Sequence, residues 1–167
     1  MDRENAMSQM TGEEDARMAQ SKVLVIENNP QNMELLVAYL ETLGCQVRTA
    51  PDGIAGLEKV KIEPPDLILL DVMMPRMSGF EVCRKLKSDP ASRDIPVLMV
   101  TALNELEDIE RGVESGTDDF ISKPVNRLEL LTRVRSLLRV RHLKNELERT
   151  LAYLNDVETR AGPRRGR

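Results

Sequence analysis

Polar side chains stand at the ends of four short apolar runs, and together they could bind a ligand. They are an acid beside an amide, a central carboxylate, a hydroxyl and an ammonium, at Glu27–Asn28, Asp71, Thr101 and Lys123. Asp71 ends the most apolar run, 67–70, which cannot continue past Pro75 because proline lacks the N–H of a sheet ladder. Ligands bind at the carboxyl ends of strands in open α/β sheets, although an Asp there is also a common turn residue or helix cap.

The elements that must position these groups alternate regularly. Five short apolar segments are predicted strands, at 23–26, 45–49, 67–71, 97–101 and 119–122. Amphipathic segments follow the first four, and their predicted helix starts lie at Asn29–Pro30, Pro51-Asp52-Gly53, Ser78 and Asn104. This β-α repetition predicts an α/β fold with a parallel sheet and right-handed crossovers.

The last predicted helix differs from the others in length. No Gly or Pro occurs from Val125 to about Glu158, so the helix would be about 50 Å long and would outrun the domain. Its later apolar residues are typical of a coiled-coil seam; they are Val140, Leu143, Leu147, Leu154 and Val157. The seam has one gap, at Thr150, and Leu151 lies beside it. The alternative is that these side chains fold back on the domain.

The composition argues against several classes of function. The net charge of −4 and the 2% of aromatic residues argue against a general nucleic-acid-binding surface. No apolar run has the length of a membrane span or of a secretory signal, which favours a cytoplasmic protein. A single histidine, His142, excludes a zinc site built on histidines. We expect a disordered leader at 1–20 and a basic disordered tail at 161–167.

At residues 21–138 the chain resembles the receiver domain of two-component response regulators. The resemblance lies in several spaced motifs in fixed order: Glu27–Asn28, the segment 71–75, Thr101 and Lys123–Pro124. The segments 71–75 and 83–87 are most similar to receivers of diguanylate-cyclase regulators, although no cyclase domain follows here. The resemblance implies a flavodoxin-like (βα)5 doubly wound sheet with strand order 2-1-3-4-5, followed by a helical extension at 139–160.

The resemblance also implies roles for individual residues. Asp71 would be the phosphoacceptor, and Thr101 and Lys123 would contact the phosphoryl group. Mg²⁺ would lie among Glu27, Asn28, Asp71 and the backbone carbonyl of Met73. These residue types suit the reaction, because a carboxylate is a nucleophile toward phosphorus and the transferring oxygens need charge stabilisation.

Two further positions carry expectations from the family. Phe120 takes the place of the aromatic switch residue whose rotamer follows Thr101, and it lacks the hydroxyl of a tyrosine. The peptide bond before Pro124 is expected to be cis.

This chain departs from the family at the metal site. Two acids usually follow the first strand, whereas Glu27 is here followed by the neutral Asn28. We therefore expect weaker Mg²⁺ binding, by roughly tenfold, than in a typical receiver. Apolar Met73 and Leu103 flank the approach of water to Asp71, so we also expect slow loss of a phosphoryl group.

Two functions of different classes follow. The first is a phosphoacceptor, not an enzyme in the ordinary sense, which takes its phosphoryl group from a sensor histidine kinase or histidine phosphotransfer protein and signals to an unknown downstream protein. The second is a phosphate-independent pseudo-receiver acting as a coiled-coil scaffold. A homodimer through the last helix fits either function, and fewer than 30 residues after Leu138 leave too little chain here for the usual DNA-binding domain.

Overall fold

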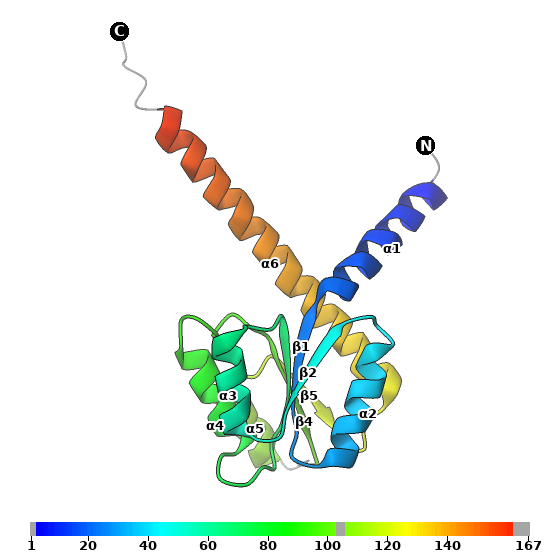
Figure 1. Cartoon of the computed structure of the whole chain (residues 1–167), viewed down its shortest axis with the longest axis vertical. Coiled ribbons are helices and arrows are strands. Elements are labelled where there is room, and N and C mark those ends of the chain that lie inside the picture. The colour runs from blue at the N-terminus through cyan, green and yellow to red at the C-terminus, as the bar shows by residue number, and fades with distance from the viewer. Residues whose placement is uncertain (1–2, 103–105, 162–167) are drawn as a thin grey trace.

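The computed structural model describes residues 3–102 and 106–161, and its centre is a five-stranded parallel sheet (Figure 1). The strands are β1 (Lys22–Ile26), β2 (Gln46–Ala50), β3 (Leu67–Asp71), β4 (Val97–Thr101) and β5 (Asp119–Ser122). Their spatial order is β2-β1-β3-β4-β5, and all neighbours are parallel. The expected α/β fold and strand order are confirmed.

The inner strands of the sheet are buried because helices cover both of its faces. Every residue of β3 and β4 is buried, whereas the edge strands β2 and β5 are partly exposed. The helices between strands are α2 (Pro30–Glu41), α3 (Gly53–Ile62), α4 (Gly79–Ser88) and α5 (Leu106–Ser115), and α6 (Arg127–Ala161) follows β5. Helices α2 and α6 cover one face of the sheet, and α3, α4 and α5 cover the other (Figure 1).

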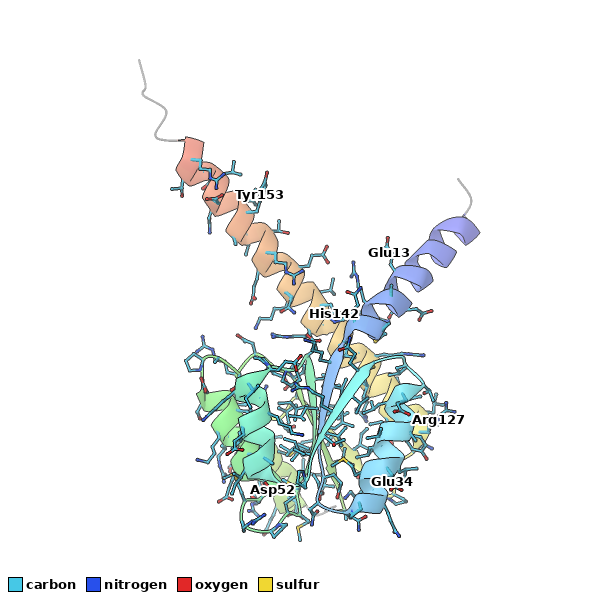
Figure 2. All side chains as sticks on the ribbon, in the orientation of Figure 1. Glu13, Glu34, Asp52, Arg127, His142 and Tyr153 are labelled. Carbon is cyan, nitrogen blue, oxygen red and sulfur yellow. The ribbon has the colours of Figure 1, made fainter. Side chains whose placement is uncertain are left out.

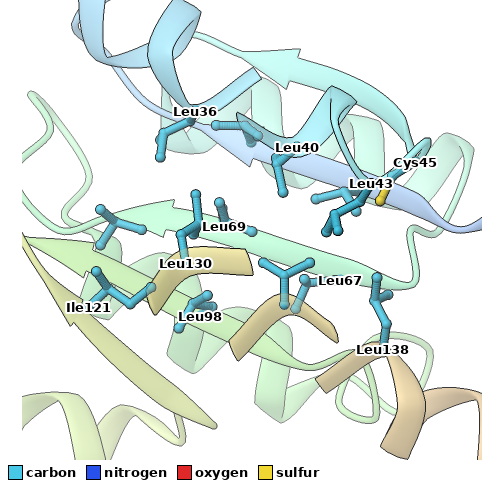
Figure 3. Packing of buried hydrophobic residues seen from close by; sticks show 14 of the residues in the cluster. Leu36, Leu40, Leu43, Cys45, Leu67, Leu69, Leu98, Ile121, Leu130 and Leu138 are labelled. Carbon is cyan, nitrogen blue, oxygen red and sulfur yellow. The ribbon is translucent and has the colours of Figure 1, made fainter. Parts of the chain in front are cut away.

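Alternate residues of each strand point to opposite faces of the sheet and pack into two separate hydrophobic clusters. On one face, Val25 and Leu69 pack with Leu40 of α2 and Val134 of α6, and Figure 3 shows this cluster. On the other face, Leu70 packs with residues of α3 and α4. The period-two alternation of a strand produces this division, and it fixes which way each strand end points.

Local capping signals determine where the helices begin. Asn29 caps α2 by accepting a hydrogen bond from the Asn32 N–H, and Pro30 is the first helical residue. Ser78 caps α4 in a reciprocal capping box with Glu81. The start predicted for α5 at Asn104 lies outside the described residues.

The N-terminal segment differs from the sequence prediction. A disordered leader was expected at 1–20, but the structure has the helix α1 (Arg3–Gln20) there. Met18 is only 3% exposed in the core, the Ser21 hydroxyl donates to the Arg17 carbonyl at 2.8 Å, and Arg139 of α6 pairs with Glu14. The sequence prediction was wrong because the burial of Met18 and the pairing of Glu14 with Arg139 connect this segment to distant parts of the chain, which local periodicity does not reveal.

Helix α6 runs from the sheet face out beyond the domain, as its length predicted. Leu130, Val134 and Leu138 are fully buried, but the apolar residues from Val140 onward are exposed. Figure 2 labels His142 near α1 and Tyr153 farther out on the part of α6 that projects from the domain. The alternative in which these leucines fold back on the domain is therefore wrong. None of the described helices is both long and apolar enough to cross a bilayer.

Candidate functional site

The predicted site residues Glu27, Asp71 and Lys123 meet at the carboxyl edge of the sheet. The Lys123 Nζ lies 3.0 Å from Glu27 Oε2 and 3.3 Å from Asp71 Oδ1. One ammonium group thus contacts two carboxylates that come from other strand ends.

The strand register brings these side chains together. Ile26 pairs with Leu70, Asp71 with Val100, and Thr101 with Ser122, so consecutive strands end at nearly the same level. The Lys123 N–H also donates to the Thr101 carbonyl at 2.7 Å, which places Thr101 beside Lys123.

Burial makes the charges at this site interact strongly. Asp71 is 3% exposed and Glu27 is 2% exposed. Burial raises the pKa of Asp71, and the neighbouring Glu27 charge raises it further. Lys123 and a backbone hydrogen bond from Met73 oppose this change, but the pKa of Asp71 stays above its ordinary value.

Asn28 lies at the other oxygen of Asp71. One terminal atom of its amide is 3.1 Å from Asp71 Oδ2 and 3.2 Å from the Met73 carbonyl oxygen. With nitrogen at that position, the amide donates to both acceptors. With oxygen there, three oxygens from Asn28, Asp71 and Met73 converge.

The two separations from the inner Asn28 atom suit ligands of a small divalent cation. Mg²⁺ binds oxygen at about 2.1 Å in an octahedron, which puts neighbouring oxygens about 3.0 Å apart, close to the 3.1 Å to Asp71 Oδ2 and the 3.2 Å to the Met73 carbonyl oxygen. Among the described residues no cluster of three or more histidine, cysteine, aspartate or glutamate side chains could hold a metal ion. A cation at this edge would therefore depend on amide and backbone oxygens in addition to carboxylates.

Glu27 contributes to the site differently from Asn28. Its Oε1 accepts from the Asn29 N–H at 3.1 Å, and its Oε2 pairs with Lys123. Both Glu27 oxygens therefore already have partners, and the contact with Lys123 holds that ammonium group in place.

The expected switch residues occupy neighbouring levels of the sheet. Thr101 is 5% exposed at the end of β4, and Phe120 of β5 pairs with Met99, two residues before Thr101 on the same strand. The half-buried Phe120 ring packs under α5, where a Cβ added at Gly112 would overlap it. The Lys123–Pro124 peptide bond is cis, as the resemblance implied.

Two features beside the site were not found by sequence reasoning. A Cβ added at Gly79 would overlap the carbonyl oxygen of Asp71, so only glycine allows α4 to begin this close to the site. Asp52 caps α3 and also accepts from Arg76 at 3.0 Å, which ties the loop after β3 to α3. The sequence shows the Gly79 and Asp52 turn signals but not what they contact.

Comparison with known proteins identifies the family. The sequence model of the response regulator receiver domain matches residues 23–135. The chain belongs to the response regulator receiver domain family. This match includes β2 to β5, all of β1 except Lys22, and every predicted site residue.

Individual relatives agree with the family. The chain is 46% identical over 127 residues to the response regulator PleD of Caulobacter vibrioides, covering 76% of this chain and 28% of PleD. It is 44% identical over 118 residues to the DNA-binding dual master transcriptional regulator RpaA of a Synechocystis species, covering 71% of this chain and 49% of RpaA. The matched region thus spans half or less of these curated relatives.

Solved structures show the same architecture. The receiver domain of a signal transduction histidine kinase from Syntrophus aciditrophicus matches with a TM-score of 0.69 and 38% identity, over 72% of this chain and 91% of that one. The chemotaxis protein CheY4 of Vibrio cholerae matches with a TM-score of 0.67 and 29% identity, over 71% and 98%.

Proposed function

We propose that this receiver accepts a phosphoryl group on Asp71 from the phosphohistidine of a sensor histidine kinase or histidine phosphotransfer protein. The observation that carries the proposal is the contact of Lys123 Nζ with Oδ1 of the buried Asp71 carboxylate at 3.3 Å. A carboxylate with a fixed ammonium beside it is arranged for an incoming anion.

The transfer is a simple exchange of bonds. An Asp71 carboxylate oxygen forms the new O–P bond while the P–N bond of the donor phosphohistidine breaks, and the histidine nitrogen keeps the electron pair. Lys123 is placed to stabilise charge on the phosphoryl oxygens, and Thr101 ends the neighbouring strand with a hydroxyl. Apart from this self-catalysed transfer and slow autodephosphorylation, we propose no enzymatic activity.

Mg²⁺ would be held by the Asp71 carboxylate, the Asn28 amide oxygen and the Met73 carbonyl, with Glu27 beside it. When bound, the ion would neutralise part of the charge on the transferring phosphoryl group. The phosphoryl group then adds a charge of about −1.5 to −2 beside Thr101, and we propose that Thr101 and Phe120 pass this change to the α5 face through packing.

The decisive experiment treats the full chain with acetyl phosphate and Mg²⁺ and measures intact mass. We expect an increase of one phosphoryl group that is absent in Asp71→Asn. The matched control is Asp66→Asn, the same change at the residue directly before β3 begins. Asp66 accepts a hydrogen bond there from the Lys22 N–H at 2.8 Å. Labelling of Asp71→Asn, or none in the wild type, would contradict the proposal.

A second candidate function rests on the apolar stripe of α6. Leu147, Leu151 and Leu154 are between 50% and 59% exposed on the projecting part of the helix. We propose that this stripe pairs with the same stripe of a second copy, since side chains at this spacing form a coiled-coil seam. If Asp71 is not phosphorylated, this pairing would be the working part of a phosphate-independent scaffold.

Sedimentation of point variants and of a shortened chain tests the pairing. We expect the full chain to sediment as a dimer and Leu147→Lys to sediment as a monomer. Ala152→Lys, on the opposite side of the same helix, should leave the dimer intact. A monomeric wild type, or equal masses for the full chain and a chain ending at Leu138, would overturn the dimer.

A further inference from the structure

The neutral residue at the metal site sits between two hydrogen-bond acceptors. The inner terminal atom of the Asn28 amide lies 3.1 Å from Asp71 Oδ2 and 3.2 Å from the Met73 carbonyl oxygen. Neither acceptor carries a hydrogen when Asp71 is ionised. The contact is therefore attractive if the inner atom is the amide nitrogen of Asn28, and repulsive if it is the amide oxygen.

An asparagine side chain can present either of two chemically opposite groups to the same point. Its nitrogen donates two hydrogens and its oxygen accepts. With nitrogen inward, both short contacts are hydrogen bonds, and the one to Asp71 is assisted by charge. With oxygen inward, three oxygens face one another, which is favourable only when a cation lies among them.

We infer that the Asn28 amide rotates when the metal binds, so that its nitrogen and oxygen exchange positions. Without metal, the nitrogen points inward and donates to Asp71 and the Met73 carbonyl. With metal, the oxygen points inward and becomes a metal ligand. The inference rests on the proposed function for its metal, and it adds a role that an acid at this position could not have. Asn28 lies on the exposed side of the site, which leaves room for the rotation.

Charge explains why the metal-free site should be more stable with an amide than with an acid at position 28. Glu27 and Asp71 share the single cation Lys123, which leaves one excess negative charge in this group. Aspartate at position 28 would add a third carboxylate within hydrogen-bond distance of Asp71. The amide instead supplies donors to Asp71, so the empty site has its own compensation.

The first test measures thermal unfolding of the full chain in EDTA and in Mg²⁺. In EDTA we expect Asn28→Asp to melt roughly 3 °C or more below the wild type, and to gain more than the wild type when Mg²⁺ is added. The control is Asn29→Asp, the same change one residue along, where the side chain caps α2. It should melt within about 1 °C of the wild type in EDTA.

The second test follows the amide itself by NMR of protein labelled with ¹⁵N at asparagine. The Asn28 side-chain signal is assigned by its loss in Asn28→Asp. Addition of Mg²⁺ should move this signal more than those of Asn29 and Asn32, because it exchanges two protein acceptors for water.

Two results would overturn the inference: equal melting temperatures of Asn28→Asp and wild type in EDTA, or an Asn28 signal that moves no more than its neighbours. Neither measurement needs phosphorylation. A chain that rotates Asn28 but cannot be phosphorylated would contradict the proposed function alone. A chain that is phosphorylated without this rotation would contradict the inference alone.

Discussion

Replacing Asp71 with asparagine should stabilise the metal-free protein at neutral pH, even though it removes the proposed phosphoacceptor. Asp71 is 3% exposed, and Glu27 contacts the same Lys123 nitrogen. Burial and the Glu27 charge raise the pKa of Asp71, which means that the folded state disfavours its ionised form. Asparagine keeps the size of the side chain and removes the charge.

The magnitude follows from three opposing contributions. Glu27 and Asp71 lie within about 6 Å of each other through Lys123, so their repulsion is about 3 kcal/mol at an effective dielectric of about 20. The attraction to Lys123 at 3.3 Å is about 5 kcal/mol on the same scale, and the desolvation of a buried carboxylate costs about 3 kcal/mol. The sum is a net cost of about 1 kcal/mol, equivalent to roughly 3 °C in Tm. The hydrogen bonds from the Met73 N–H and the Asn28 amide enter the comparison little, because the amide oxygen of an asparagine can still accept them.

The pH dependence has a definite sign. Because the folded state holds the Asp71 proton more tightly than the unfolded state, stability falls as pH rises from the ordinary carboxyl pKa through the folded one. The advantage of Asp71→Asn should therefore be largest at neutral pH and should disappear on acidification below the ordinary carboxyl range.

Urea unfolding in EDTA at several pH values measures this difference. Glu110→Gln, on the exposed outer side of α5, is the control and should change stability by less than about 0.5 kcal/mol. If Asp71→Asn is no more stable than the wild type at neutral pH, then Lys123 fully compensates both carboxylates and the charge argument fails.

Three other predictions concern metal affinity, phosphate lifetime and packing. Asn28→Asp should bind Mg²⁺ about tenfold more tightly by calorimetric titration, because it restores a charged ligand; equal affinities would refute this. Phosphorylated Asp71 should lose its phosphoryl group slowly, since the apolar Met73 flanks the approach of water, and rapid decay of the purified phosphoprotein would count against it. Leu103, expected to flank the other side, lies outside the described residues. Gly112→Ala should destabilise the fold by about 1–3 kcal/mol through overlap with the Phe120 ring; an unchanged urea midpoint would mean that the ring moves aside freely.

The sequence by itself determined the elements and the chemical types at the site. Apolar runs such as 67–70 indicate buried strands, and Asn29–Pro30 and Ser78 with Glu81 indicate helix starts. These signals are readable because capping bonds and side-chain periodicity act over a few residues. The spaced motifs, in their fixed order along the chain, also indicate the receiver family without any knowledge of which side chains meet.

Only the tertiary structure decided which groups touch. Lys123 pairs with Glu27 across 96 positions of sequence, and no local pattern distinguishes Glu27 from Asp71 as its partner. The N-terminal helix was missed because its order comes from Met18 in the core and from the pairing of Glu14 with Arg139 of α6. Strand order and register set such contacts over long sequence separations, so they arise only when the whole sheet is assembled.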